Sequence, residues 1–247
     1  MIWPILCVDD FYRNPDQVIE FANSLDFYES NGTFPGERTK SLHEIDITFF
    51  LHTTNKIVSS LYPNDINNIK WSATQHFQKI DPKIHKTRGF IHQDNSHEFT
   101  SIIYLTKNLN SGTCFYRRIK EAIPNHDFLR NDSYKNIEKL EEDSFKEEID
   151  KNNKCFEKTV EFKSLKNRMI LFDGSLDHGV ENFGEDDEIR LTLVTFFDYV
   201  ARIATNCGYV LKLGPLCYHD KDKFPTVLGV KKKIGLSLPD TLVQDYQ

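Results

Sequence analysis

The sequence predicts a mainly β domain, a sandwich or jelly roll, with helices near its N-terminus and one charged helical insertion. Short segments that alternate between apolar and polar residues recur from residue 71 to residue 199, and turns rather than crossover helices separate them. Phenylalanine, which favours strands, occurs 19 times. Hydrophobic residues make up 39% of the 247 residues, which is enough for one sizeable core. We therefore expect a single domain over residues 1–247.

Residues 1–70 are expected to support the β core with short strands and helices. Residues 5–8 are predicted to form a strand. Asn14 and Pro15 predict the start of a helix, because asparagine caps helices and proline suits the first helical position. The pattern of residues 45–51 is typical of a strand, and a second, short helix is expected over residues 54–61.

Residues 71–199 are expected to form the β core itself. Trp71, Ala73, Gln75 and Phe77 alternate with polar residues, and this two-residue period is typical of a strand. Further strands are predicted at about residues 88–93, 99–106, 112–117, 158–163, 168–173, 178–183, 189–199 and 208–213.

Residues 118–157 interrupt the strands with a segment rich in Lys, Glu, Asp and Asn. Its weak helical periodicity predicts a solvated helical insertion, and the alternative is a lid over an active-site mouth. Residues 200–247 are expected to be a C-terminal extension that either closes one end of the barrel or mediates dimerisation, so a homodimer stays open. The lysine run at residues 231–233 is interpreted as a solvated face.

Composition disfavours several classes of protein. The five cysteines form no CxxC pair, which argues against a disulfide framework or a zinc knuckle and favours a reducing compartment. The formal net charge of -6 disfavours a nucleic-acid partner. No apolar run is long enough to span a bilayer, so no membrane partner is expected. We predict a cytoplasmic protein.

His92 and Asp94 form a His-x-Asp pair at the strand predicted over residues 88–93. Residues i and i+2 of a strand face the same side, so the imidazole and the carboxylate can bind one metal ion. A chain with nine histidines can contain one such pair by chance, and the alternative is a histidine beside an unrelated acid. The pair alone would favour that alternative, so a metal site requires a further ligand elsewhere in the chain.

His178 follows a strong apolar strand, residues 168–173, and a polar turn. It is well placed to complete a set of two nitrogen ligands and one oxygen ligand with His92 and Asp94. Such a set leaves coordination positions open, as non-haem Fe(II) oxygenases require. Structural zinc sites instead fill all four positions, usually with cysteine, and no cysteine lies near these residues in the sequence.

Arg190 comes twelve residues after His178, on an alternating segment where it shares a face with Thr192. An arginine on a core face is costly unless it meets an acid. A bound dicarboxylate would satisfy the guanidinium with a two-pronged hydrogen bond, and Thr192 would add a hydroxyl. The alternative is a solvated arginine at a strand start that pairs with Asp187 or Glu188.

The order of these motifs resembles the 2-oxoglutarate/Fe(II)-dependent dioxygenase superfamily: His-x-Asp, a distant His-Gly, then Arg-x-Thr. Residues 102–106 (IIYLT) and 110–117 (NSGTCFYR) resemble the "YL…GGT.F" segment of the prolyl-4-hydroxylase-like branch. The chain looks most similar to a subgroup with a GGTxFYR-type stretch, although Ser111 replaces the first glycine. Residues 8–15 and 34–38 also resemble that subgroup, so the resemblance spans roughly residues 5–199.

The resemblance implies a double-stranded β-helix in which His92, Asp94 and His178 bind Fe(II). It implies that Arg190 and Thr192 hold the C5 carboxylate of 2-oxoglutarate. Tyr104 is a further candidate at that carboxylate, and its alternative role is core packing. Dioxygen is the co-substrate, ascorbate is a candidate additional cofactor, and hydroxylation of a C–H bond with release of succinate and carbon dioxide is the expected reaction. Halogenating relatives lack the carboxylate of Asp94, so its presence favours hydroxylation or a related oxidation.

Two other functions stay open from the sequence. One is a cupin-type metalloenzyme that does not use 2-oxoglutarate, in which Arg190 would be structural. The other is a non-catalytic β-helix used as a binding module, which the intact ligand set disfavours. Nucleic-acid demethylation is disfavoured because that branch carries a second arginine six residues after the first, where this chain has Phe196. A small molecule, an amino acid or a peptide side chain remains the expected substrate class.

Overall fold

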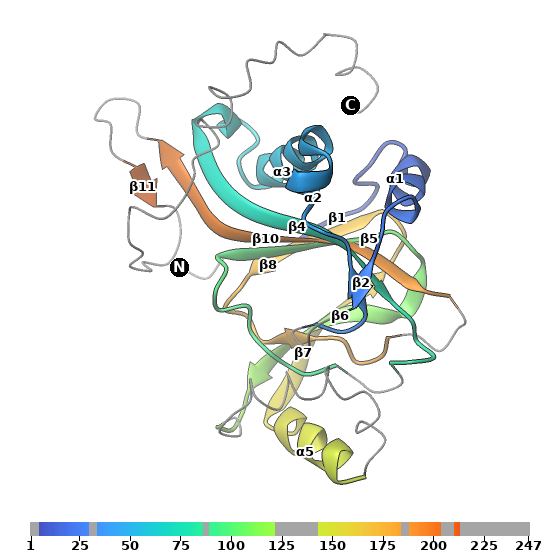
Figure 1. Cartoon of the computed structure of the whole chain (residues 1–247). Coiled ribbons are helices and arrows are strands. Elements are labelled where there is room, and N and C mark those ends of the chain that lie inside the picture. Colours follow the sequence, from blue (N-terminus) through green and yellow to red (C-terminus); the bar gives the residue numbers. More distant parts are fainter. Residues whose placement is uncertain are drawn as a thin grey trace.

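Two antiparallel β-sheets face each other across the centre of the protein (Figure 1). The large sheet has the strand order β1-β8-β5-β10-β4-β3-β2, with β11 paired to β10, and the small sheet has the order β7-β6-β9. This computed structural model describes residues 5–29, 34–85, 89–121, 143–183, 188–203 and 210–212. The strands are β1 (Leu6–Val8), β2 (Tyr28–Glu29), β3 (Glu37–Arg38), β4 (Ile69–Ile80), β5 (Phe99–Tyr104), β6 (Asn108–Arg118), β7 (Phe156–Ser164), β8 (Arg168–Asp173), β9 (His178–Gly179), β10 (Arg190–Ile203) and β11 (Val210–Lys212).

The chain passes back and forth between the two sheets, as it does in a jelly roll. It runs from β4 in the large sheet to β5, crosses to β6 and β7 in the small sheet, returns to β8, crosses to β9 and ends the core in β10. Between β4 and β5, His92 forms a bridge with His178 of β9 and thereby adds a fourth position to the small sheet. The predicted fold class, a mainly β double-stranded β-helix with flanking helices, is confirmed.

Three helices cover the outer face of the large sheet (Figure 1). They are α1 (Pro15–Asn23), α2 (Leu42–Ile45) and α3 (Ile47–Leu61). A short 3-10 turn over Ile66–Asn68 then leads into β4. The predicted helix at Pro15 is confirmed.

The strand expected over residues 45–51 is wrong, because these residues end α2 and begin α3. The carboxylate of Asp46 accepts hydrogen bonds from the backbone N–H groups of Thr48 and Phe49 at 2.9 Å and caps α3. Phe50 and Ile57 then lie buried on one face of this helix. Burial and capping outweigh the strand preference of its β-branched and aromatic residues, and the helix expected from residue 54 begins seven residues earlier.

Alternate residues of the central strands pack into two separate cores. Leu191 and Leu193 of β10 face the helices, in a cluster with Phe77, Phe99 and residues of α3. The opposite faces of the strands point between the sheets, where the cluster consists of Tyr104, Phe115, Ile170 and Phe172. The two-residue period of β10 therefore sends Arg190 and Thr192 to the space between the sheets.

Most strands of the core lie where the sequence predicts them. The strand at residues 168–173 matches β8, and those at 99–106, 112–117, 158–163 and 189–199 match strands with shifted ends. The strands predicted at residues 88–93 and 178–183 are wrong in extent. Within the described residues of the first segment, a β-bridge forms only at His92, and the second segment contains only the two-residue strand β9.

The charged insertion contains a helix, as predicted. Helix α5 (Asp143–Asn153) lies beyond the small sheet (Figure 1), while residues 122–142 lie outside the described part. Strand β11 falls within the predicted strand at 208–213, and the lysine run at 231–233 also lies outside the described residues. Among the described helices, none has the length and apolar character needed to cross a membrane. A single domain over residues 1–247 stays a prediction.

Asn167 ties the N-terminal segment to the barrel. Its side chain accepts a hydrogen bond from the Tyr12 N–H and donates one to the Tyr12 carbonyl, both at 2.8 Å. Its φ of 68° lies in the left-handed region, where asparagine is tolerated better than most residues. Asn167 is 5% exposed, so neither hydrogen bond is readily replaced by water.

Replacing Asn167 should therefore separate the hydrogen-bond and backbone contributions to stability. Asn167→Ala loses both hydrogen bonds and keeps a strained φ, so its free energy of unfolding should fall by about 2–4 kcal/mol. Asn167→Gly loses the same bonds without the strain and should fall less. Urea unfolding measures both variants. Equal losses in the two would show that the left-handed backbone contributes nothing.

Candidate metal centre

The three predicted metal ligands converge at one point between the sheets. The nearest ligand atoms of His92, Asp94 and His178 all lie within 4.8 Å of one another. The Nε2 atom of His92 is 3.7 Å from Asp94 Oδ1, and that of His178 is 3.4 Å from Asp94 Oδ2. Two imidazoles and one carboxylate are the donor set of a facial triad that suits Fe(II).

Backbone carbonyls fix which nitrogen of each ring carries the proton. The Nδ1 atom of His92 lies 2.8 Å from the Phe90 carbonyl, and that of His178 lies 2.8 Å from the Leu176 carbonyl. A carbonyl oxygen only accepts, so both Nδ1 atoms donate. The Nε2 atoms then hold their lone pairs toward Asp94, which is the tautomer that a metal ligand needs.

Asp94 is held as a carboxylate by its surroundings. The Thr100 hydroxyl donates to Asp94 Oδ2 at 2.7 Å. Burial raises the pKa of Asp94, but the proximity of His178 and His92 and the hydrogen bond from Thr100 together outweigh burial and hold this pKa well below its usual range. The hydrogen bond from Thr100 also fixes the orientation of the Asp94 carboxylate.

Asp94 reaches the site through a turn rather than through a strand. Its N–H donates to the Gly174 carbonyl at 2.7 Å. A Cβ atom on Gly174 would lie 2.2 Å from the His97 carbonyl and 2.7 Å from the Asp94 carbonyl, so only glycine lets these two loops pack this closely. The expected shared strand face of His92 and Asp94 is therefore not the reason that they meet.

The charged insertion supports the His92 segment from the other side. Asn153, the last residue of α5, is 3% exposed, and its side-chain oxygen accepts a weak hydrogen bond from the Ile91 N–H at 3.4 Å. Its amide group donates toward the Gly89 carbonyl at 3.5 Å. The end of the insertion therefore packs under the residues that lead into His92.

Arg190 lines the same cavity as the three ligands and is 4% exposed. Its Nε donates to the Ser111 carbonyl at 3.0 Å, and its guanidinium carbon lies 5.6 Å from the centre of the Tyr104 ring. Burial lowers the pKa of Arg190. Within the described part of the chain, no carboxylate forms an ion pair with it, so the pairing with Glu188 that the sequence left open is absent, and Asp187, the other partner left open, lies outside the described residues.

The two other predicted cosubstrate residues differ in their surroundings. Thr192 is buried beside Arg190, and its hydroxyl has no hydrogen-bond partner among the described residues. Tyr104 packs beneath Arg190, and its hydroxyl donates to the Thr113 hydroxyl at 2.7 Å. Neither Thr192 nor Tyr104 lines the cavity, whereas Thr113, the hydrogen-bond partner of Tyr104, does.

The cavity has a volume of about 90 Å³, and several of its residues carried no sequence signal. Thr100 contacts Asp94 although no local pattern marks it. Arg38 and Phe34 come from the N-terminal segment, where only the resemblance of residues 34–38 pointed to them. Phe196 lies on β10 two residues beyond Val194, so the alternation that places Arg190 in the cavity also places Phe196 there.

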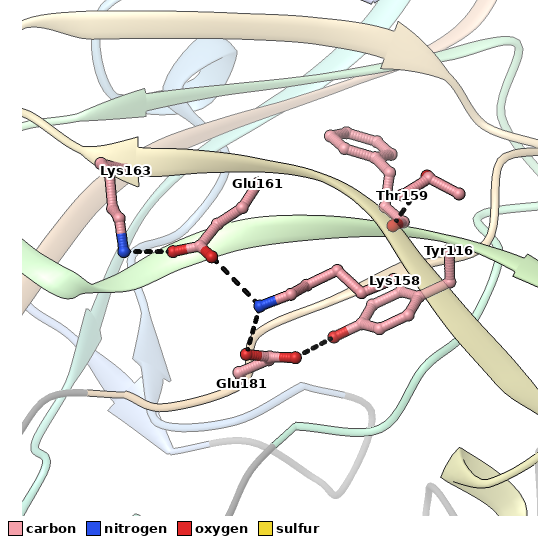
Figure 2. Close-up of polar contacts among 7 residues, drawn as sticks. Tyr116, Lys158, Thr159, Glu161, Lys163 and Glu181 are labelled. Atoms are coloured by element: carbon pink, nitrogen blue, oxygen red, sulfur yellow. Dashed lines mark hydrogen bonds and ion pairs between the residues drawn. The ribbon is translucent and has the colours of Figure 1, made fainter.

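A second group of ligand-type side chains, Cys114, Glu161 and Glu181, lies on the outer face of the small sheet. Figure 2 shows the Lys158 ammonium between the two carboxylates, 3.1 Å from Glu161 and 2.9 Å from Glu181. Burial and both glutamates raise the pKa of the Cys114 thiol to about 11, which disfavours the thiolate that binds metals. The group is thus an ion-pair network that links β7 to the segment after His178.

The Thr100 hydroxyl should set the metal affinity. We expect Thr100→Val to weaken metal binding by about 10- to 100-fold, because loss of a hydrogen bond to a ligand typically has this effect. Competition with a fluorescent chelator measures it. Thr53→Val removes another buried hydroxyl, one bonded to Tyr12 at 3.1 Å outside the cavity, and should leave the affinity unchanged. Equal affinities in wild type and Thr100→Val would show that this hydrogen bond does not tune the site.

Several solved structures are similar to this chain at low sequence identity. HygX from Streptomyces hygroscopicus, with nickel and 2-oxoglutarate bound, is 11% identical with a TM-score of 0.47, covering 78% of this chain and 82% of its own. EvdO2 from Micromonospora carbonacea var. aurantiaca is 13% identical with a TM-score of 0.48, covering 81% and 88%. A prolyl hydroxylase from Trichoplax adhaerens, in complex with a hypoxia inducible factor peptide, is 13% identical with a TM-score of 0.45, covering 78% and 82%.

No curated protein matches the sequence. A family model described as a family of unknown function (DUF6445) does match it, over residues 3–196. That match spans most of the 247 residues and includes His92, Asp94, His178 and Arg190. The chain therefore belongs to the DUF6445 family.

Proposed function

We propose that this chain is an Fe(II)- and 2-oxoglutarate-dependent dioxygenase that hydroxylates a C–H bond of a small molecule, an amino acid or a peptide side chain. The observation that carries the proposal is one cavity lined both by the His92, Asp94 and His178 triad and by the buried guanidinium of Arg190. Ascorbate as an additional cofactor and a cytoplasmic location belong to the same proposal.

The triad fits Fe(II) better than it fits a structural metal. His92 and His178 present neutral nitrogens, because their other nitrogens donate to backbone carbonyls. Asp94 adds one negative charge, and Thr100 holds one of its oxygens. Three ligands leave positions open for a chelating cosubstrate and for dioxygen, whereas a structural zinc site needs a fourth protein ligand.

The residues near the triad fit the distal carboxylate of 2-oxoglutarate. A buried guanidinium with no carboxylate partner among the described residues costs several kcal/mol, by the general penalty of about that size for burying an ion. A dicarboxylate would offset this cost through paired hydrogen bonds. The unpartnered hydroxyl of Thr192 beside Arg190 supplies one more donor for the same group. Tyr104 would act from beneath, by holding the guanidinium in place.

The residues that line the cavity, together with Thr192 behind Arg190, divide the tasks of this reaction among them. With both bound, Fe(II) and 2-oxoglutarate supply the oxidation of a substrate C–H bond, with release of succinate and carbon dioxide. His92, Asp94 and His178 hold the metal, and Arg190 with Thr192 orients the cosubstrate. The apolar walls exclude water from the reacting atoms, and they include Phe90, Phe183 and Val194.

Loss of the carboxylate ligand should abolish turnover. Wild type, supplied with Fe(II), should convert 2-oxoglutarate to succinate, at least in the slow uncoupled reaction, and Asp94→Ala should not. Succinate is measured by mass spectrometry. Asp198→Ala is the matched control, because it removes an acid that bonds another histidine, His97, at 2.7 Å and that does not line the cavity. Equal succinate from wild type and Asp94→Ala would rule the mechanism out.

Loss of the buried guanidinium should weaken cosubstrate binding rather than metal binding. Arg190→Gln should raise the Kd of 2-oxoglutarate by about 30-fold or more, because truncating one partner of a buried charge pair costs about 2 kcal/mol or more. The visible charge-transfer band of the anaerobic Fe(II) protein reports this binding. Arg202→Gln removes a cation from the same strand that pairs with Asp65, and it should bind normally. A wild type that binds metal but shows no such band would indicate the cupin-type alternative.

A further inference from the structure

The segment that carries His92 is held from two sides. On one side the Gly89 N–H donates to the Val180 carbonyl at 2.6 Å. On the same side the His92 N–H donates to the His178 carbonyl at 2.9 Å. Backbone groups of an extended segment point alternately to its two sides, so the Gly89 carbonyl and the Ile91 N–H point the other way. On that side, the end of helix α5 meets them.

Asn153, the last residue of α5, makes this contact with its side-chain amide. The amide oxygen accepts from the Ile91 N–H at 3.4 Å, and the amide nitrogen donates to the Gly89 carbonyl at 3.5 Å. An amide carries both an acceptor and donors, so this one side chain imitates a neighbouring strand. Both hydrogen bonds are long, but Asn153 is buried, and a buried amide depends on its protein partners because water does not replace them.

The amide of Asn153 is itself held by buried structure. The side chain of Asn152, which is fully buried, donates to the Asn153 oxygen at 3.2 Å. Cys155, two residues later, packs with Ile91 in one apolar cluster. The Cys155 carbonyl also accepts from the N–H of Ile119, directly after β6, at 2.9 Å. The end of α5 is therefore anchored to the small sheet.

One peptide group connects Asn153 to the ring of His92. The Phe90 carbonyl and the Ile91 N–H belong to the same peptide, which is planar and rigid. Asn153 binds its N–H end, and the Nδ1 atom of His92 donates to its carbonyl end at 2.8 Å. A tilt of this peptide would turn the imidazole and move its Nε2 atom, which lies 3.7 Å from Asp94. It would also move Phe90, which lines the cavity.

We propose that Asn153 is a positioning residue for the metal centre: by holding the peptide between Phe90 and Ile91, it sets the orientation of the His92 ring. Asn153 does not line the cavity, so it acts through His92 alone. The groups that orient a metal ligand tune the affinity and the geometry of the metal. The charged insertion thus contributes to the reaction through the end of α5. This inference rests on the proposed function, in which His92 binds the metal.

Metal binding and the cobalt(II) spectrum test the inference without turnover. Asn153→Ala removes both hydrogen bonds to the His92 segment. It should weaken metal binding about tenfold, the low end of the effect of a direct ligand partner, because Asn153 acts through one more link. Competition with a fluorescent chelator measures the affinity. The visible d–d absorption of the cobalt(II)-loaded protein reports coordination geometry and should change. An unchanged spectrum in the folded variant would overturn the proposal.

Asn167→Ala is the matched control for a loss of stability. The Asn167 side chain also bridges a backbone N–H and a carbonyl, those of Tyr12, and it is buried but does not line the cavity. Urea unfolding should show a loss of stability in both variants, whereas the cobalt(II) spectrum should change only in Asn153→Ala. The same spectral change in both variants would assign the effect to general destabilisation and overturn the proposal.

A second variant keeps the test decisive if Asn153→Ala does not fold by circular dichroism. Asn153→Asp keeps the oxygen that accepts from Ile91 and loses the group that donates to Gly89. It should still alter the cobalt(II) spectrum. A folded Asn153→Asp with the wild-type spectrum would overturn the proposal.

Binding of 2-oxoglutarate separates this inference from the proposed function. If wild type shows the charge-transfer band and Asn153→Ala keeps the wild-type cobalt(II) spectrum, the inference fails and the proposed function stands. A wild type that binds cobalt(II) but not 2-oxoglutarate would defeat the proposed function, and the spectra would still decide the role of Asn153. A wild type that binds no metal would defeat both.

Discussion

The backbone pair between His92 and His178 is the constraint on which the rest of the site depends. Each residue donates its N–H to the carbonyl of the other, at 2.9 and 2.8 Å. Directly opposed residues of an antiparallel pair present their side chains on the same face, so the two rings lie 4.4 Å apart between their centres. Together with the hydrogen bond from the Gly89 N–H to the Val180 carbonyl at 2.6 Å, this pair joins two distant parts of the chain at the edge of the small sheet. Asp94 and the cavity walls are placed relative to it.

Strand β10 serves stability and the cavity at the same time. Its residues alternate between the helix-side core, which takes Leu191 and Leu193, and the cavity, which takes Arg190, Val194 and Phe196. Because β10 pairs with β4 on one side and β5 on the other, it cannot slide without moving both sets. The packing of the outer core therefore determines the position of the groups that would contact a ligand.

Much of this site could be predicted from the sequence, and the exceptions have physical causes. Alternation correctly places Arg190 and Thr192 together, since both lie within one regular strand. Alternation does not explain why Asp94 lies beside His92, because Asp94 reaches the triad through a turn packed on Gly174 and not through a strand. Arg38 reaches the cavity through contacts between segments far apart along the chain, and Thr100 reaches Asp94 across a turn of irregular backbone, so no periodic pattern encodes either contact. Residues 45–51 are helical and not a strand, because the Asp46 cap and the burial of one helix face outweigh the strand preference of the individual residues.

Each histidine is oriented by a carbonyl only two residues before it, Phe90 for His92 and Leu176 for His178. Short, local pieces of main chain thus set the orientation of the two rings, whereas most of the side chains that line the cavity come from other segments. Mutation can remodel those walls without disturbing the ring orientations. Substitutions in the walls would therefore change which molecules fit the cavity while the arrangement of the three candidate metal ligands is retained.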